Sequence, residues 1–221
     1  MKNKLKKLLH DTTIISIYED NSDKPILGKP RDVSRFQQDQ GEQKKLENLE
    51  NYWDKKFHSF KNVWNKERQL YRFLYDQFRL FHRSFTQLRI NKVAYLESKN
   101  SQNDFHIHEF SATNLASMYL FGKKMINLTK KLKLNQYLNE NENCFIERFS
   151  KTRNVLFEHN FNANDYPGVL FDPNFWSIAA SDSFLKIDIH TQNESEYYAL
   201  IDYYQDYYDL ESTVVKIIKN F

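Results

Sequence analysis

Apolar residues recur at steps of three and four over much of the chain, the spacing that lines one face of a helix. Two such stripes follow one another between residues 46 and 88. The stripes consist of Leu46, Leu49, Trp53, Phe57, Phe60 and Trp64, and then of Leu70, Leu74, Phe78, Phe81, Phe85 and Leu88. We predict a break between them near residues 62–65, because globular helices seldom run so long.

The same spacing predicts three more helices, over residues 110–134, about 144–159 and 194–218. The third helix would turn Leu115, Met118, Phe121, Met125 and Leu128 inward, and the last would turn Tyr197, Ile201, Tyr204, Tyr208 and Val215 inward. The polar runs 98–104 and 139–143 are expected to be loops. No proline occurs between Pro30 and Pro167, as long helices require.

Three short runs are instead typical of strands, since they are β-like and flanked by Pro, Gly and Asp. They cover residues 14–18, 169–171 and 185–189 and are expected to form a small sheet beside the helices. The predicted fold class is mainly α, an up-and-down bundle of four to five helices with a small β appendage. We predict an irregular or β-structured segment at 1–40 and a helical domain at 41–221 with a β-like insertion at about 165–191.

Composition supports a helical protein with a core of large rings. Aromatic residues make up 16% of the chain, whereas only 4 Gly and 4 Pro are available for the turns of an all-β fold. The single Cys144 cannot form an internal disulfide and is predicted to be a core residue. No run has the length of a signal peptide or a membrane span, so we expect a cytoplasmic protein without a membrane partner.

The formal net charge of +3 permits an anionic partner without requiring one. A specific indication comes from residues 149–160, Phe-Ser-Lys-Thr-Arg-Asn-Val-Leu-Phe-Glu-His-Asn. Arg153 is followed directly by Asn154, and His159 comes after four further residues. This segment resembles the signature of the HEPN superfamily, an Arg and a polar residue followed at short spacing by a His. The predicted late helix in a helical bundle matches the setting of that signature.

The resemblance implies a metal-independent, cofactor-free endoribonuclease with Arg153, Asn154 and His159 as catalytic residues. The residue types fit the chemistry, because histidine titrates near neutral pH and the arginine fork can stabilise charge on a phosphate. Asn154 would orient the phosphate, the ribose or His159. Attack by the ribose 2′-OH would restrict cleavage to RNA.

Positions six apart on a helix differ by about 120° in azimuth and about 9 Å along the axis. One copy of the motif therefore does not converge on one phosphate unless the helix ends at His159 or two copies meet. The resemblance implies a homodimer with a shared groove. It also implies a place in a toxin–antitoxin, phage-defence or RNA-processing system, with an antitoxin or regulatory protein as partner. Phe161 departs from HEPN toxins that carry a Tyr two residues after the His. The alternatives are a non-catalytic domain of this type that binds RNA or a nucleotide, or a helical interaction module.

Other candidate sites are weaker. Lys123, Lys124, Lys130 and Lys131, with Lys133 nearby, can contact RNA phosphates or form a solvated helix face. His106 and His108 would converge on a metal only on a strand, so no metal site is predicted. The tyrosine pairs between residues 197 and 208 lie among acidic residues, which favours core or dimer packing over base stacking.

Overall fold

A computed structural model gives the fold, and it describes residues 2–21, 25–28, 51, 55, 66–97, 101–157, 166–174, 184–192 and 196–220. The helices are α1 (Lys2–Asp11), α3 (Lys66–Glu97), α4 (Ser101–Lys131), the 3₁₀ helix η1 (Leu134–Tyr137), α5 (Glu140–Phe157) and α7 (Tyr203–Asn220). The strands are β1 (Ile14–Glu19), β2 (Pro25–Gly28), β3 (Val169–Asn174), β4 (Phe184–Thr191) and β5 (Glu196–Asp202). The protein is thus mainly helical with a small antiparallel sheet, as predicted.

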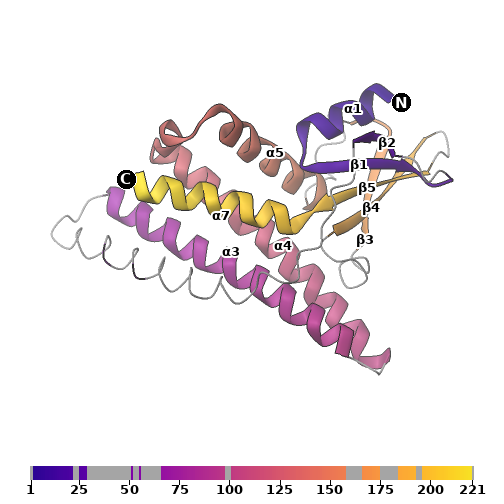
Figure 1. Cartoon of the computed structure of the whole chain (residues 1–221), viewed down its shortest axis with the longest axis horizontal. Coiled ribbons are helices and arrows are strands. Elements are labelled where there is room, and N and C mark those ends of the chain that lie inside the picture. Colours follow the sequence, from indigo (N-terminus) through magenta and orange to yellow (C-terminus); the bar gives the residue numbers. More distant parts are fainter. Residues whose placement is uncertain are drawn as a thin grey trace.

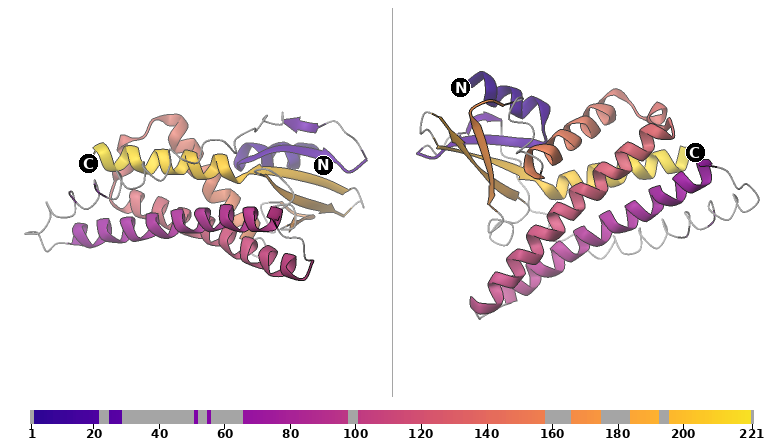
Figure 2. Two further views of the ribbon diagram at one scale, coloured as in Figure 1. Left: turned by 60° about the horizontal axis from the view of Figure 1, so that its bottom comes forward. Right: turned by 180° about the vertical axis from the view of Figure 1, so that it is seen from behind.

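The long helices α3 and α4 form an antiparallel pair that reaches well beyond the rest of the molecule (Figure 1). Helix α7 lies along this pair, and α5 lies on the other side of α7 from α3 (Figure 1). The sheet and α1 are gathered at one end, as the view from behind confirms (Figure 2). The second predicted stripe, from Leu70 to Leu88, lies within α3. All six residues of the first stripe lie outside the described residues; in that part of the chain only Asn51 and Lys55 are described, and both are helical.

Aromatic rings form the centre of the helical core. Tyr207 of α7 stacks on Phe85 of α3 with ring centroids 3.8 Å apart and lies 4.9 Å from Phe81. Tyr119 of α4 stacks on Phe149 of α5 at 5.0 Å. These side chains are fully or almost fully buried. The predicted core of large rings is confirmed, and core packing is confirmed for the tyrosines of α7 that are buried, Tyr203, Tyr204 and Tyr207.

The sheet has the strand order β2-β1-β5-β4-β3, and its neighbours pair in antiparallel fashion. Alternate residues of β4 are buried because successive strand side chains point to opposite faces. In the centre, Ala199 of β5 pairs with both Ile17 of β1 and Ile187 of β4, and all three are completely buried. Strand β1 therefore belongs to the same sheet as the strands that follow α5.

The predicted helix over residues 194–218 is wrong in its first part, because Glu196–Asp202 forms strand β5. Tyr197 and Ile201 fit the helical spacing, but the strand is favoured since it fills the gap between β1 and β4 and pairs along both. Asp202 then starts α7, where its Oδ1 accepts a hydrogen bond of 2.9 Å from the backbone N–H of Gln205.

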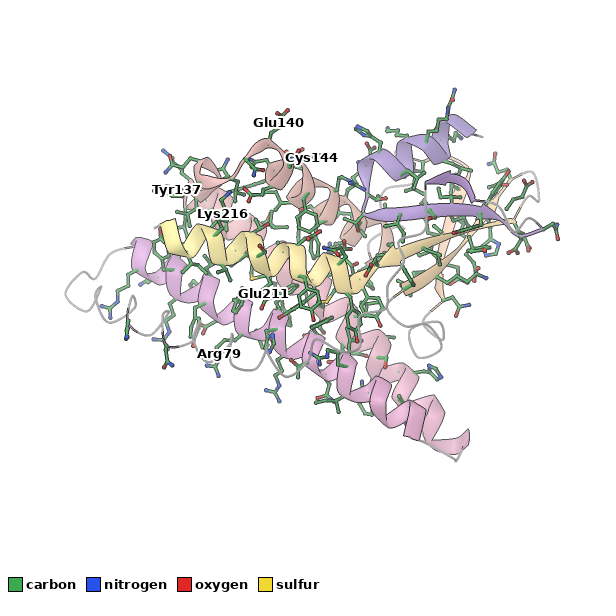
Figure 3. All side chains as sticks on the ribbon, viewed as in Figure 1. Arg79, Tyr137, Glu140, Cys144, Glu211 and Lys216 are labelled. Atoms are coloured by element: carbon green, nitrogen blue, oxygen red, sulfur yellow. The ribbon has the colours of Figure 1, made fainter. Side chains whose placement is uncertain are left out.

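Three further expectations are corrected. Residues Lys2–Asp11 of the segment predicted to be irregular or β form helix α1, which buries Leu5 and Leu8. The predicted loop 98–104 ends early, because α4 already begins at Ser101. Cys144 is exposed rather than buried in the core, and it lies on the outer side of α5 (Figure 3). It precedes the buried stripe of that helix, which begins at Ile146.

Within the described ranges, no helix combines the length and the apolar character that crossing a membrane requires.

Candidate functional site

Helix α5 carries the Arg153–Asn154 pair, and its start is fixed by a reciprocal cap. The Asn139 N–H donates to Glu142 Oε2 at 2.7 Å, while the Glu142 N–H donates to Asn139 Oδ1 at 2.9 Å. Lys216 of α7 adds a contact of 2.7 Å to the same glutamate. The buried face of α5 holds Ile146, Phe149, Val155 and Leu156 against the neighbouring helices. The amphipathic helix predicted for this segment is confirmed, and it starts four residues earlier than predicted. Its predicted end at residue 159 lies outside the described residues.

Arg153 and Asn154 lie in the last helical turns before α5 ends at Phe157. Both are half-buried, and the Arg153 Nη1 donates to Asn154 Oδ1 over 3.5 Å, the long end of the hydrogen-bond range. The two motif residues therefore touch each other. His159 lies outside the described residues, so its position relative to Arg153 stays a prediction.

Where the described chain resumes at Tyr166, it packs on the N-terminal helix α1. The Tyr166 hydroxyl donates to Asp11 Oδ2 at 3.3 Å, and its ring lies under Lys7 with 5.8 Å between Nζ and the centroid. The Lys4 ammonium donates to the Pro167 carbonyl. Helix α1, which the sequence pattern did not predict, thus holds the chain soon after the motif segment.

The lysines proposed to bind RNA lie on α4, where Lys124, Lys130 and Lys131 are exposed and Lys123 is half-buried. The Lys124 Nζ lies 5.3 Å from the centroid of the Phe121 ring. The structure thus has an exposed basic end of α4.

A buried polar cluster that no sequence pattern indicated lies beside α5. The carboxylate of Asp206 in α7 accepts hydrogen bonds of 2.6 Å from the Thr13 hydroxyl and from the Tyr119 hydroxyl, both at Oδ2. Thr13 also donates its backbone N–H to Thr152 Oγ1 at 2.7 Å, and Thr152 donates to the Arg148 carbonyl at 2.9 Å. Helices α4, α5 and α7 meet the start of β1 at this cluster.

Burial dominates the electrostatics of the cluster. It raises the pKa of Asp206 to about 7, and the hydrogen bonds from Thr13 and Tyr119 oppose this rise only in part. Burial and the neighbouring Asp206 also raise the pKa of the Tyr119 phenol, which therefore keeps its proton. Asp206 is consequently a carboxyl that titrates near neutral pH although it makes two hydrogen bonds.

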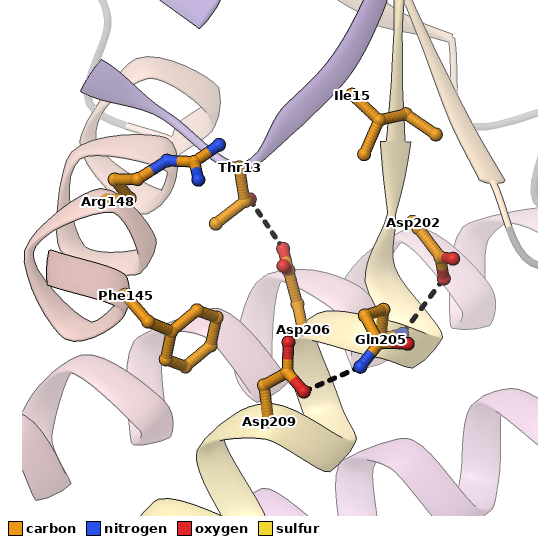
Figure 4. A pocket seen from close by; sticks show the side chains of 8 residues that line it. All are labelled: Thr13, Ile15, Phe145, Arg148, Asp202, Gln205, Asp206 and Asp209. Carbon is orange, nitrogen blue, oxygen red and sulfur yellow. Dashed lines mark hydrogen bonds between the residues drawn. The ribbon is translucent and has the colours of Figure 1, made fainter. Parts of the chain in front are cut away.

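A small pocket opens next to this cluster and is lined by Thr13, Ile15, Phe145, Arg148, Asp202, Gln205, Asp206 and Asp209 (Figure 4). Its volume is about 50 Å³. Arg148 in its wall donates from Nε to the Thr12 carbonyl at 2.6 Å, and so caps the C-terminal end of α1. The signal of this site in the sequence is the set of acidic residues among the tyrosine pairs, which we used above only to favour packing over base stacking.

A second hydrogen-bond chain joins α3 to α7. His82 Nδ1 lies 2.5 Å from the Tyr207 hydroxyl, His82 Nε2 lies 3.0 Å from Thr86 Oγ1, and the Tyr207 hydroxyl donates to Glu211 Oε1 at 3.2 Å. A neutral His82 with its proton on Nδ1 satisfies every step of this chain. Burial, with a smaller contribution from Arg89, lowers the pKa of His82 to about 4. The group is thus suited to packing rather than to proton transfer at neutral pH.

His106 and His108 lie on helix α4 rather than on a strand. His106 is exposed and pairs with Glu109 at 3.8 Å, whereas His108 is buried. Among the residues described, no group of three or more His, Cys, Asp or Glu side chains is arranged to hold a metal ion.

No protein-family model, curated protein or solved structure matches this chain.

Proposed function

We propose that the protein is a metal-independent endoribonuclease of the HEPN type, with Arg153, Asn154 and His159 as its catalytic residues. The observation that carries the proposal is the contact between Arg153 and Asn154 in the last turns of an amphipathic helix. The mainly helical fold and the short spacing from this pair to His159 support it.

The proposed reaction is an intramolecular transfer at phosphorus. A base removes the proton of the ribose 2′-hydroxyl, and the 2′-oxygen forms a bond to the phosphorus. The bond between the phosphorus and the 5′-oxygen breaks, and an acid gives a proton to this leaving oxygen. His159 would serve as the acid or base of these transfers. Arg153 would stabilise the charge that develops on the non-bridging oxygens, and Asn154 would hold the guanidinium or the phosphate in place.

A homodimer would complete this site if the helical spacing extended to His159, because positions six apart on one helix are too far apart to share one phosphate. Two copies of the motif facing one groove would bring an arginine of one chain to a histidine of the other. The exposed Lys124, Lys130 and Lys131, with Lys123, would then bind the RNA backbone outside the groove. A role in a toxin–antitoxin or phage-defence system, under control of an antitoxin or regulatory protein, belongs to the same proposal.

Cleavage of a labelled single-stranded RNA by the full-length protein tests the proposal. His159→Ala and Arg153→Ala are each expected to lower the cleavage rate at least 100-fold. The matched controls are His190→Ala and Arg83→Ala, which remove an exposed histidine of β4 and an exposed arginine of α3 and should leave the rate unchanged. EDTA should have no effect, and an RNA with a 2′-deoxy residue at the cleaved position should resist.

Undiminished cleavage by His159→Ala, or cleavage that EDTA stops, would contradict the proposed mechanism. If the wild type cleaves no RNA but binds it, and Arg153→Ala abolishes binding, the non-catalytic alternative is correct. If the wild type neither cleaves nor binds RNA, the chain is a helical interaction module.

A further inference from the structure

Helix α1 has a basic face that the proposed catalytic residues do not use. The helix turns Leu5 and Leu8 into the core, where each is 1% exposed. Its opposite face follows the steps i, i+3, i+4 and i+7 and consists of the exposed residues Asn3, Lys6, Lys7 and His10. We call these four residues the α1 basic face. The first acidic residue of the helix is Asp11 at its end, so the face itself carries no carboxylate.

The lysines of the α1 basic face are not neutralised by the rest of the described chain. No Asp or Glu of the described residues forms an ion pair with Lys6 or Lys7. Lys7 lies over the Tyr166 ring, with 5.8 Å between Nζ and the centroid. The Asp11 carboxylate instead lies 3.1 Å from His10 Nδ1 and accepts a hydrogen bond from the Tyr166 hydroxyl. The positive charge of the two lysines is therefore available to an anionic partner.

Helix α1 contacts the chain on both sides of the proposed catalytic segment. Just after the helix, the Thr13 N–H donates to Thr152 Oγ1 at 2.7 Å, and Thr152 directly precedes Arg153. Beyond the segment, the Lys4 ammonium donates to the Pro167 carbonyl. Figure 1 shows the end of α1 next to the last turns of α5. The α1 basic face thus lies on an element that is fixed close to the proposed site.

The partner that suits this face is a nucleic-acid strand rather than a lipid surface. An amphipathic helix binds a membrane by burying its apolar face among the lipids. In α1 that face is already occupied, because Leu5 and Leu8 are buried and Leu9 packs against the core. Lysines bind the phosphates of a nucleic acid through their charge alone, without an apolar face.

We propose that the α1 basic face binds the phosphate backbone of the RNA that is cleaved at Arg153. The choice of RNA rests on the proposed nuclease function, whereas the preference for a phosphate backbone rests on α1 itself. Lys6 and Lys7 would contact phosphates that do not react, so they stabilise the bound substrate and the transition state equally. Their loss should therefore raise KM and leave kcat unchanged.

Fluorescence anisotropy of the full-length protein with a labelled 2′-O-methyl RNA measures binding without cleavage, because this RNA lacks the attacking hydroxyl. The double variant Lys6→Ala with Lys7→Ala should bind about tenfold more weakly at physiological salt, as loss of two phosphate contacts implies. The slope of log affinity against log salt concentration should become less steep by about 1.4, or about 0.7 for each lysine. Unchanged affinity and slope in this variant would overturn the proposal.

Two further variants control for charge and for folding. Lys6→Arg with Lys7→Arg keeps both charges and should bind RNA like the wild type. Arg79→Ala with Arg83→Ala removes the same charge from exposed positions of α3, and it should keep the affinity and slope of the wild type. Thermal unfolding should be unchanged in all three double variants, because the replaced side chains are exposed. An arginine variant that binds as weakly as the alanine variant would contradict binding through charge.

Vesicles of phosphatidylcholine and phosphatidylserine test the lipid alternative. The wild type should bind them no better than vesicles of phosphatidylcholine alone. If the alanine variant at Lys6 and Lys7 loses vesicle binding while its affinity for RNA is unchanged, the face serves a membrane and the proposal is wrong.

Cleavage kinetics separate this inference from the proposed function. In the alanine variant at Lys6 and Lys7, KM should rise about tenfold at unchanged kcat. If the wild type cleaves RNA and this variant has the same KM, the inference is overturned and the nuclease function stands. If the wild type cleaves no RNA but binds it through the two lysines, the α1 basic face is confirmed as a binding surface and the nuclease function fails.

Discussion

Two neighbouring residues of α5, Thr152 and Arg153, belong to polar clusters of different kinds. Thr152 is 1% exposed and lies in a network that joins it through Thr13 to Asp206. Arg153 is half-buried, and its contact with Asn154 joins residues adjacent in the sequence. Side chains next to each other on a helix point about 100° apart, so one helix can contribute to both clusters. The buried network of Thr152 forms only when distant parts of the chain pack together. The Arg153–Asn154 pair, in contrast, is contiguous and can be found from the sequence.

Removal of the buried Asp206 carboxylate should give the largest loss in the free energy of unfolding, and so should separate the two clusters most clearly. Asp206→Ala leaves the Thr13 and Tyr119 hydroxyls without their acceptor in the core, which should cost about 3 kcal/mol of the free energy of unfolding. Arg153→Ala is the matched variant of the accessible cluster and should change it by less than about 1 kcal/mol. Urea denaturation followed by circular dichroism measures both. An equal loss in the free energy of unfolding in the two variants would contradict the expected difference between the buried and the accessible cluster.

A close contact next to the buried cluster gives the second largest expected effect. A Cβ atom at Gly122 of α4 would lie 2.7 Å from the Phe149 ring and 2.8 Å from Leu210. Gly122→Ala should therefore destabilise the protein by about 2 kcal/mol, since both neighbours are buried and the α4–α5–α7 crossing must open. Thermal unfolding checks the effect, and Ala112→Gly, on the same helix at a half-buried position, serves as the reverse substitution. A stabilised Gly122→Ala variant would be incompatible with this packing.

Two buried titratable groups should oppose each other in the pH dependence of stability. The pKa of Asp206 is raised to about 7, so its contribution is complete below its ordinary pKa near 4 and is lost as the pH rises through 7. The pKa of His82 is lowered to about 4, so its contribution is complete above 6.5 and is lost as the pH falls towards 4. Between pH 4 and 6.5 the two slopes should largely cancel.

Single substitutions separate these slopes. In Asp206→Asn the free energy of unfolding should fall on acidification from pH 6.5 to 4, by up to about 1.4 kcal/mol per pH unit. In His82→Gln it should fall on the opposite change, from pH 4 to 7. Urea denaturation at intervals across this range gives both slopes. A slope of the same sign in the two variants would refute the assignment.

The cap of α5 should give the smallest effect. Asn139→Ala removes the acceptor of the Glu142 N–H and should cost about 1 kcal/mol, with no change in the contacts of Asp206. Asn135→Ala, at an exposed position of η1, is the control. Denaturant unfolding detects the difference, and a loss as large as that of Asp206→Ala would contradict the expected order of the effects.

The sequence could predict those parts of the fold that depend on local pattern. The apolar steps of α3 and α5 and the β-like runs of β1, β3 and β4 are visible in the chain itself. Strand β5 was mistaken for helix because Tyr197, Ile201 and Tyr204 satisfy the helical spacing, and only the neighbouring strands decide against it. The signal that could have corrected this was Asp202 with Gln205 three residues later, a helix-start pattern.

The candidate sites also differ in whether a local pattern in the sequence could indicate them. Arg153 and Asn154 were found because the motif is contiguous, and their helical setting was predicted from spacing. Asp206, Thr13 and Tyr119 come from three distant parts of the chain, and none has an unusual local sequence. Only the packing of β1 and α4 against α7 reveals that they share one buried carboxylate.

The pairing of β1 with β5 has a consequence for how the chain is made. Ile14 and Ile201 are register partners although they stand far apart in the sequence, with α3, α4 and α5 between them. A ribosome therefore releases β1 and β2 long before β5, the partner of β1 on its other side, has been made. A two-stranded ribbon alone is only marginally stable in water. Completion of the sheet must wait until β5 has been translated, so contacts of such long range are expected to slow the final step of folding.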